Sequence, residues 1–357
     1  MSAPAVGLTA EKERSPVRSA ARLVVVLAWA VLLLAPPPVS AQSYKPEFKN
    51  SLVTNDQTTW GQSAIRFADL LRERTQGRVA VKNYWSGELF AGKQTNEFTL
   101  LTRGVADFAF GSTINWSPQV KELNLFNLPF FFPSYRALDA VEEGEPGQKL
   151  FRIIEAKGVV PLAWGENGYR ELTNSKRPVR KPEDLAGLKI RVVGSPMFIE
   201  TFRALGANPV DMDFDEALRA FPQGTVDGQE NPVVNVITPY KLWTSQKHIT
   251  LWRYAIDPMV IAVSRVTWDR LSAADREIVR TTAVEVAAWQ KAEARKGLDG
   301  STEAVEVLRQ SGMDVVALSP AELAAFRAKT RPVVAKWTPK IGADLVRAAE
   351  QIIARVK

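Results

Sequence analysis

The middle of the chain contains four short segments that decide its fold: ENGYRELTN (166–174), LAGLKIRV (185–192), ALGANP (204–209) and VDGQENP (226–232). The stretches around them alternate in character, with strand patterns over 188–193 and 209–212 and helix patterns over 196–205 and 215–221. Alternating strands and helices are typical of α/β proteins whose strands are largely parallel. We therefore predict an α/β unit in this part of the chain.

The preceding part of the chain shows the same alternation. Apolar residues from Trp60 to Leu71 recur at spacings of three, four and seven, as on one face of a helix, and Gly77 ends the pattern. With 357 residues, and about 100–200 residues to a domain, two α/β domains are expected. The predicted elements here are strands over 47–54, 78–84 and 105–110 and helices over 58–76 and 93–103.

The C-terminal part is predicted to be helical. Ser272 and Asp275 resemble a capping box and begin a run towards Arg295, which at 1.5 Å per residue is about 36 Å long. A helix of that length can lie across two small domains. Ser319 and Glu322 form a second, full capping box with proline at the first helical position.

Composition excludes several kinds of catalytic and metal site. The absence of cysteine excludes disulfide scaffolds, cysteine-ligated zinc, iron–sulfur clusters and thiol catalysis, and a single histidine, His248, excludes a multi-histidine metal site. No phosphate-binding glycine loop and no GxSxG motif occurs. Asp211, Asp213 and Asp215 imitate a calcium loop, but Glu216 and Pro222 replace its required glycine and glutamate, so a solvated acidic turn is favoured.

The N-terminus has the pattern of a secretory signal peptide. Basic residues precede an apolar run from Leu23 to Ala35, which is shorter than the about 20 residues that span a bilayer. Three prolines and the small residues before Gln42 follow, so we predict a signal peptide over 1–41 that is cut after Ala41, with a membrane anchor as the alternative. The net charge of +7 is spread along the chain without a basic block, which argues against nucleic acid as a partner.

Several tryptophans follow predicted strand ends, where ligand clefts open in α/β proteins. Trp116 and Trp164 are of this kind and are candidates for stacking on a ligand, although packing in a core is the alternative for each. Trp60 lies on the apolar face of a predicted helix and fits the core or the edge of a cleft.

Taken in order, the four central segments resemble the solute-binding subunits of tripartite ATP-independent periplasmic (TRAP) transporters, of the dicarboxylate-binding-protein type. The likeness extends to Gly77-Arg78, to Asn127-Leu128-Pro129-Phe130 and to the signal peptide, and so covers nearly the whole mature chain. It implies an α/β, two-domain periplasmic-binding-protein (Venus-flytrap) fold with a long helix bridging both domains. We place domain I at 42–167 plus about 257–296, and domain II at 168–256 plus about 297–357.

The resemblance also implies a site. Arg191, in the KIRV-like strand, would pair with a ligand carboxylate, with Arg170 and Asn231 assisting and Phe214 lining the cleft. Relatives that bind sialic acid carry an acidic residue where this chain has Gly111, which argues against that ligand. The remaining candidate contacts are Trp60, Trp116, Trp164, Glu230 and Asn55.

Elementary chemistry supports arginine in this role. A carboxylate that enters a closed cleft loses its water, and the planar, permanently charged guanidinium restores hydrogen bonds to both oxygens. The ligand itself stays open among dicarboxylates, keto acids, aromatic acids and sugar acids. No cofactor is expected, and a metal ion bridging the ligand through Glu230 and Asn231 is left open.

The expected function is therefore that of a periplasmic, monomeric solute-binding protein without catalytic residues. It would capture a small organic acid and deliver it to the small and large membrane subunits of a TRAP permease, without itself being embedded in the membrane. One alternative is a ligand-binding partner of a sensor kinase. The other is a secreted enzyme using the same cleft, for which Glu166 or Glu230 would have to supply acid–base chemistry.

Overall fold

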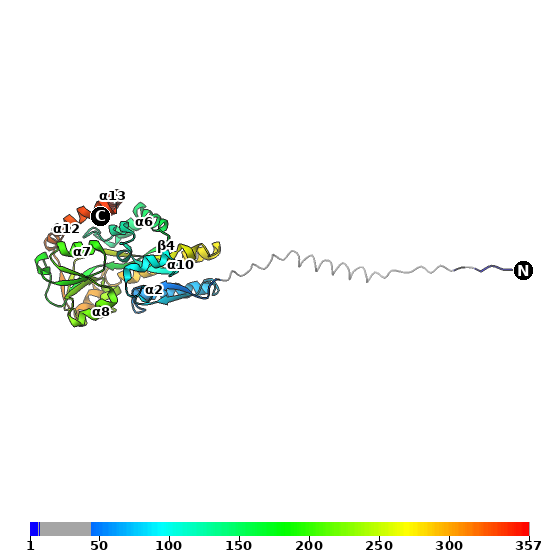
Figure 1. Ribbon diagram of the computed structural model, residues 1–357, viewed down its shortest axis with the longest axis horizontal. Coiled ribbons are helices and arrows are strands. Elements are labelled where there is room, and N and C mark those ends of the chain that lie inside the picture. Colours follow the sequence, from blue (N-terminus) through cyan, green and yellow to red (C-terminus); the bar gives the residue numbers. More distant parts are fainter. Residues whose placement is uncertain (6, 8–43, 357) are drawn as a thin grey trace. The chain divides into compact units, whose positions relative to one another are not determined.

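The computed structural model describes residues 1–5, 7 and 44–356 (Figure 1). The chain divides into two units, Met1–Ser43 and Tyr44–Lys357, and the helices and strands of the described residues lie in the second, here called the main unit. The predicted apolar core of the signal peptide and its cleavage site lie outside the described residues. Within the described part, no helix is long and apolar enough to cross a membrane.

Sheet A has five strands in the order β2-β1-β3-β10-β4. β1 is parallel to both β2 and β3, whereas β10 is antiparallel to its neighbours β3 and β4. The strands are β1 (Phe48–Ser51), β2 (Val81–Tyr84), β3 (Phe108–Ser112), β4 (Val159–Tyr169) and β10 (Ile256–Ser264).

Sheet B has six strands in the order β11-β9-β5-β8-β6-β7. β6 is parallel to β7 and β8, and β11 is parallel to β9, but β5 runs antiparallel to both β8 and β9. The strands are β5 (Glu171–Asn174), β6 (Lys189–Val192), β7 (Asn208–Asp211), β8 (Gly228–Asn231), β9 (His248–Leu251) and β11 (Asp314–Ala317). Both sheets are therefore mixed, which corrects the prediction of largely parallel strands.

The mixed pairing follows from how the chain crosses between the sheets. It leaves sheet A at Tyr169, enters sheet B at Glu171, and returns between Leu251 and Ile256. The backbone N–H of Arg170 donates to the carbonyl of Ala255 (2.9 Å), so the two crossings lie against each other. Long strands that run out of one sheet and back into it are necessarily antiparallel, as β4 and β10 are.

Helices cover both sheets. α2 (Thr59–Arg74) begins at Thr58, whose side chain accepts from the backbone of Gly61, as the periodicity predicts. The other α-helices that the structure describes between residues 44 and 300 are α3 (Glu97–Thr102), α4 (Thr113–Trp116), α5 (Tyr135–Glu143), α6 (Glu145–Ala156), α7 (Pro196–Ala204), α8 (Phe214–Gln223), α9 (Arg265–Trp268) and α10 (Ala273–Arg295).

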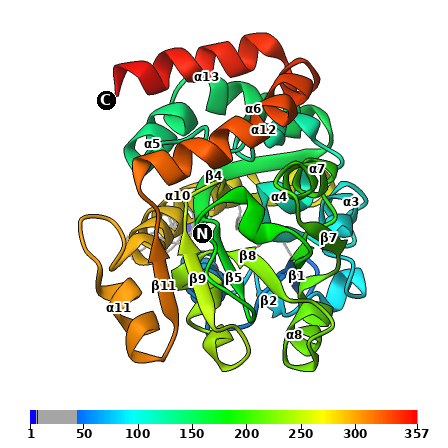
Figure 2. The ribbon, with the colours of Figure 1, turned by 90° about the vertical axis from the view of Figure 1, so that its left-hand side faces the viewer.

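The helix with the longest sequence pattern, α10, also contacts Val233–Ile237, which follow β8 of sheet B, and a second helix connects the halves as well. α10 packs chiefly on α2 and β4, that is, on sheet A, because its buried face is apolar towards that sheet. After α11 (Glu303–Gln310) and β11, the helix α12 (Pro320–Ile341) contacts α7 beside sheet B and then α13 (Ala343–Arg355). Figure 2 shows α13 lying over α5 and α6, both of which precede β4 in the chain, so α12 connects the two halves.

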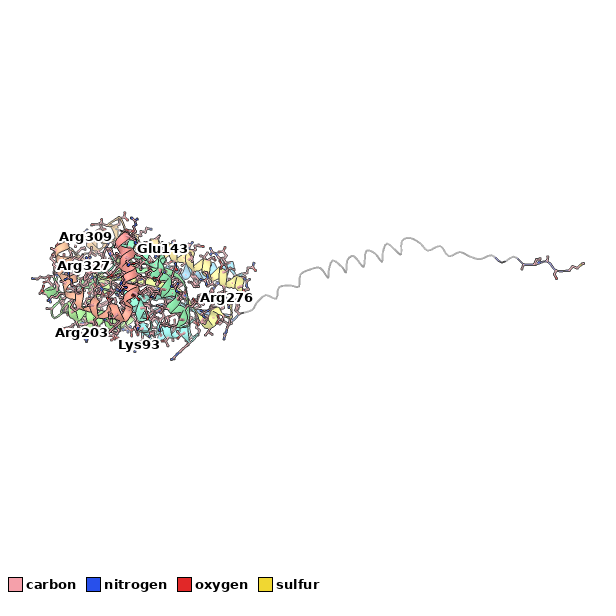
Figure 3. All side chains as sticks on the ribbon, turned by 90° about the horizontal axis from the view of Figure 1, so that it is seen from above. Lys93, Glu143, Arg203, Arg276, Arg309 and Arg327 are labelled. Carbon is pink, nitrogen blue, oxygen red and sulfur yellow. The ribbon has the colours of Figure 1, made fainter. Side chains whose placement is uncertain are left out.

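The charged side chains labelled in Figure 3 come from several different elements. Lys93 precedes α3, Arg203 is on α7 and Arg327 is on α12, and all three are exposed (Figure 3). This spread agrees with the even distribution of charge along the sequence.

Candidate ligand-binding site

A narrow cavity of about 20 Å³ lies where strands of both sheets end. Residues after β1 and at the end of β3 line it from sheet A, and residues at the ends of β6 and β8 line it from sheet B, in keeping with the usual position of ligands in α/β folds. All of the lining residues are buried. They are Val53, Thr54, Trp60, Gln94, Ser112, Asn115, Asn167, Arg170, Arg191, Val193, Phe214, Asn231, Val236 and Asp257.

Arg191 is one of two buried arginines that line this cavity. It lies in β6, is 1% exposed, and donates from Nε to the carbonyl of Met212 (2.8 Å) and from Nη2 to Oε1 of Gln94 (3.1 Å). Among the described residues, no carboxylate lies within 4.0 Å of its guanidinium nitrogens. Burial lowers the pKa of Arg191 to about 10, because the charged form has lost its water, and it still remains charged at neutral pH.

Arg170, by contrast, already has anionic partners. Its Nε and Nη2 donate to the two carboxylate oxygens of Glu230 (2.5 and 2.7 Å), and Nη2 also donates to the Glu230 carbonyl (2.7 Å). Its Nη1 lies 3.6 Å from Oδ2 of Asp257. Burial acts to lower the pKa of Arg170, but the two carboxylates raise it above its ordinary value.

Asp257 sits at the start of β10, where the pairing with β4 is irregular, and it is fully buried. It accepts hydrogen bonds from the hydroxyls of Ser112 (2.8 Å) and Thr113 (3.0 Å) and from Nδ2 of Asn167 (2.8 Å). These donors hold one wall of the cavity in a fixed arrangement.

Gln94 connects the two halves across the cavity. Its Oε1 accepts from the backbone N–H of Phe214 (2.8 Å) as well as from Arg191, and its Nε2 donates to Oδ1 of Asn115 (2.6 Å). The ring of Phe214 lies 5.7 Å from the Arg191 guanidinium and meets Tyr240 edge to face. Trp60, in the first turn of α2, is 2% exposed, and its indole Nε1 has no hydrogen-bond partner among the described residues.

The structure brings five of the nine residues predicted from the sequence to the cavity and places the other four elsewhere. Those at the cavity are Arg191, Arg170, Asn231, Phe214 and Trp60. Glu230 lies behind Arg170, and Asn55 lies in the turn before α2, where its backbone N–H donates to the hydroxyl of Tyr240.

Two predicted tryptophans belong to the core instead. Trp116 meets Phe98 edge to face and donates to Oε2 of Glu97 (3.1 Å). Trp164 stacks on Phe151 with 4.5 Å between ring centroids. Trp116 follows β3, as predicted, whereas Trp164 lies within β4 and not after its end, and neither residue lines the cavity.

Sequence reasoning missed Gln94, Asn167 and Asp257. Asn167 is part of the ENGYRELTN segment and was a visible candidate, whereas Gln94 has no distinguishing pattern around it. Asp257 stands alone in an apolar strand, which is a signal for a functional or paired carboxylate.

The acid–base groups that an enzyme would need are engaged elsewhere. Glu166 pairs with Nη2 of Arg295 (2.6 Å) and does not line the cavity, and Glu230 is held by Arg170 and by the hydroxyl of Tyr254 (2.9 Å). His248 lies beside Asp314 in sheet B (3.0 Å). Within the described part of the chain, no group of three or more metal-ligating side chains comes together, and Asp211, Asp213 and Asp215 form no such group.

Comparison with known proteins places this geometry in a family. Residues 50–340 match the family described as bacterial extracellular solute-binding protein, family 7. The 2,3-diketo-L-gulonate-binding periplasmic protein YiaO of Escherichia coli is 32% identical over 295 residues, covering 81% of this chain and 87% of that protein.

Solved structures of TRAP periplasmic solute-binding proteins agree. One from Ralstonia eutropha, crystallised with (S)-2-acetolactate, is 51% identical with a TM-score of 0.86, and the match covers 87% of this chain and all of that one. Another from Shewanella oneidensis, crystallised with succinate, is 29% identical with a TM-score of 0.80, covering 87% of this chain and all of that one. The predicted family and the two-domain α/β fold are thereby confirmed, and the chain belongs to the bacterial extracellular solute-binding proteins of family 7, the family of the TRAP solute-binding subunits.

Proposed function

We propose that this protein captures a small organic acid in the cavity between its two sheets by pairing the acid's carboxylate with Arg191. The observation that carries the proposal is a buried guanidinium that lines a cavity and has no carboxylate partner among the described residues. An isolated buried charge is costly unless an opposite charge accompanies it. A ligand carboxylate supplies that charge and accepts two parallel hydrogen bonds.

The relatives support the same class of ligand. The Ralstonia protein was crystallised with acetolactate and the Shewanella protein with succinate, both of which are carboxylates. We propose further that the chain is exported by cleavage after Ala41, acts as a monomer in the periplasm, and delivers its ligand unchanged to the two membrane subunits of a TRAP permease. Family membership supports the extracellular location, and the engagement of Glu166 and Glu230 supports binding without turnover.

A thermal-shift screen against a library of carboxylic acids, including acetolactate and succinate, tests the proposal. Ligand at 100 times its Kd should stabilise the protein by about 2.7 kcal/mol. The hit is then titrated calorimetrically into wild type and Arg191→Ala, with the exposed Arg203→Ala as the matched control. We expect the first variant to lose about 30-fold or more in affinity and the second to bind as wild type does.

Two results would count against the proposal. If no carboxylate stabilises the protein, or if folded Arg191→Ala binds the hit within threefold of wild type, Arg191 is not an anion site. Mass spectrometry of the ligand after long incubation separates binding from catalysis, since steady conversion by the pure protein would mean that the chain is an enzyme.

A further inference from the structure

The charges beside the cavity are unequally paired. Arg191 has no carboxylate within 4.0 Å among the described residues, whereas Arg170 contacts Glu230 through both oxygens and lies 3.6 Å from Asp257. Arg170, Glu230 and Asp257 together therefore carry a formal charge of −1, and Arg191 carries +1. One ligand carboxylate is balanced by Arg191, but a second one would meet an arginine that is already satisfied and a cavity wall that is net negative.

Two uncharged groups at the cavity lack partners. Nε1 of Trp60 and Oδ1 of Asn167 are buried without a hydrogen-bond partner among the described residues, and both side chains line the cavity. The orientation of the Asn167 amide is fixed, because its Nδ2 donates to Asp257 (2.8 Å) and a carboxylate accepts only from the amide nitrogen. Besides the cation at Arg191, the cavity therefore offers a ligand a donor at Trp60 and an acceptor at Asn167.

We infer that the cavity selects short monocarboxylates that carry a hydroxyl group beside the carboxylate, and that it discriminates against dicarboxylates. The carboxylate pairs with Arg191, the ligand hydroxyl donates to Oδ1 of Asn167, and a ligand oxygen accepts from Nε1 of Trp60. A buried polar group left unpaired costs free energy, so a ligand without the hydroxyl is rejected even where it fits. The inference rests on the proposed capture of a carboxylate and narrows its substrate class.

Four acids of equal carbon number test the inference on the protein purified after export. Butanoate, 2-hydroxybutanoate, succinate and malate vary the hydroxyl and the second carboxylate independently, and each is titrated calorimetrically into wild type. We expect 2-hydroxybutanoate to bind at least tenfold more tightly than butanoate, and at least tenfold more tightly than malate. Malate or succinate binding as tightly as 2-hydroxybutanoate would overturn the inference, as would no binding by any of the four, because 2-hydroxybutanoate satisfies every contact named.

Two variants test which residues are responsible for the selectivity between these acids. Asn167→Ala should reduce the advantage of 2-hydroxybutanoate over butanoate to less than threefold, while the exposed Asn208→Ala should leave it unchanged. Glu230→Gln leaves Arg170 less fully neutralised and should improve the binding of malate relative to 2-hydroxybutanoate at least tenfold. Unchanged selectivity in both folded variants would refute these assignments, and the four wild-type titrations remain decisive if a variant fails to fold.

The same titrations distinguish this inference from the function on which it rests. If dicarboxylates bind tightest and Arg191→Ala abolishes their binding, the proposed capture of a carboxylate stands and the inference falls. If the affinities do not depend on Arg191, the proposed function itself falls.

Discussion

Replacing Arg191 with methionine tests whether this arginine contributes to ligand binding or to the stability of the fold. Methionine is unbranched and flexible enough to fill the space of the arginine stem. The change removes two hydrogen bonds, to the carbonyl of Met212 (2.8 Å) and to Gln94 (3.1 Å), each of which contributes about 1 kcal/mol to stability. It also removes a charge whose burial the fold has to sustain without a carboxylate partner.

In the ligand-free protein, removing the buried charge should change the stability more than removing the two hydrogen bonds does. Burial lowers the pKa of Arg191 to about 10 from the ordinary value of an arginine, and at about 1.4 kcal/mol for each unit of pKa this is a cost of about 3 kcal/mol. The lost hydrogen bonds offset about 2 kcal/mol of that gain. We therefore expect the free energy of unfolding of ligand-free Arg191→Met to equal that of wild type or to exceed it by about 1 kcal/mol.

Ligand binding should respond in the opposite direction. Removing one member of a buried charge pair costs about 2–5 kcal/mol, so the Kd of the natural ligand should rise about 30-fold to several thousand-fold. Arg191→Lys should also lose affinity, because an ammonium group cannot form the two parallel hydrogen bonds of a guanidinium.

Arg170→Met is the matched control, since this arginine lines the same cavity but is paired. Its removal leaves Glu230 buried without its cation, which should lower the free energy of unfolding by about 3–5 kcal/mol. Urea denaturation without ligand and calorimetric titration with it measure both quantities for each variant. The reasoning is refuted if ligand-free Arg191→Met is destabilised by more than about 2 kcal/mol, because Arg191 would then be holding the fold.

Further predictions concern export, motion and pH. The exported protein should begin at Gln42, which N-terminal sequencing of periplasmic material checks, and an intact Met1 would contradict the predicted cleavage. Ligand should change the fluorescence of Trp60 and reduce the radius of gyration in solution scattering, because only a few crossings of the described chain connect the halves; superimposable scattering curves would argue against closure. Burial raises the pKa of Glu97 to about 8, so the folded protein keeps a proton that the unfolded chain releases above its ordinary pKa. The free energy of unfolding should therefore fall as the pH rises from about 4.5 to 8. Glu97→Gln should remove this part of the pH dependence and raise the free energy of unfolding by about 3 kcal/mol at pH 7. Urea denaturation at pH 5, 7 and 8 tests both expectations, and an unchanged pH dependence in the variant would show that Glu97 is ionised in the folded state.

The predictable parts of the fold are those with local signals. The apolar period of α2, the capping box at Ser319 and the strand that holds Arg191 all appear in the structure close to their predicted bounds. The partners of the antiparallel strand β10 could not be predicted from the sequence, because β10 pairs with β3 and β4, which lie far away in the sequence. A sequence pattern can indicate a strand, but not which neighbours it will have.

The sequence does not show in which direction a side chain points, and this was the main limit on predicting the residues of the site. Trp116 follows β3 as a cleft residue would, yet its ring packs directly over Gly111, where an added Cβ would lie 2.0 Å from the indole. Gly111 is thus required by the packing of Trp116. The absence of an acidic residue at position 111 therefore reflects a lack of space. It is weaker evidence against sialic acid as the ligand than the resemblance to the family implied.

The number of arginines at the cavity also overestimates the positive charge that is available to pair with a ligand. Arg170, between β4 and β5, and Arg191, in β6, both belong to the central segments of the sequence, and together they would permit a dicarboxylate. In the structure, β8 carries Glu230 alongside Arg170, and β10 carries Asp257 to the same place, so carboxylates of the protein neutralise one of the two cations. The relevant quantity is the charge left unpaired after folding. It depends on which strands become neighbours, so the presence of two arginines in the sequence does not by itself indicate a dicarboxylate as the ligand.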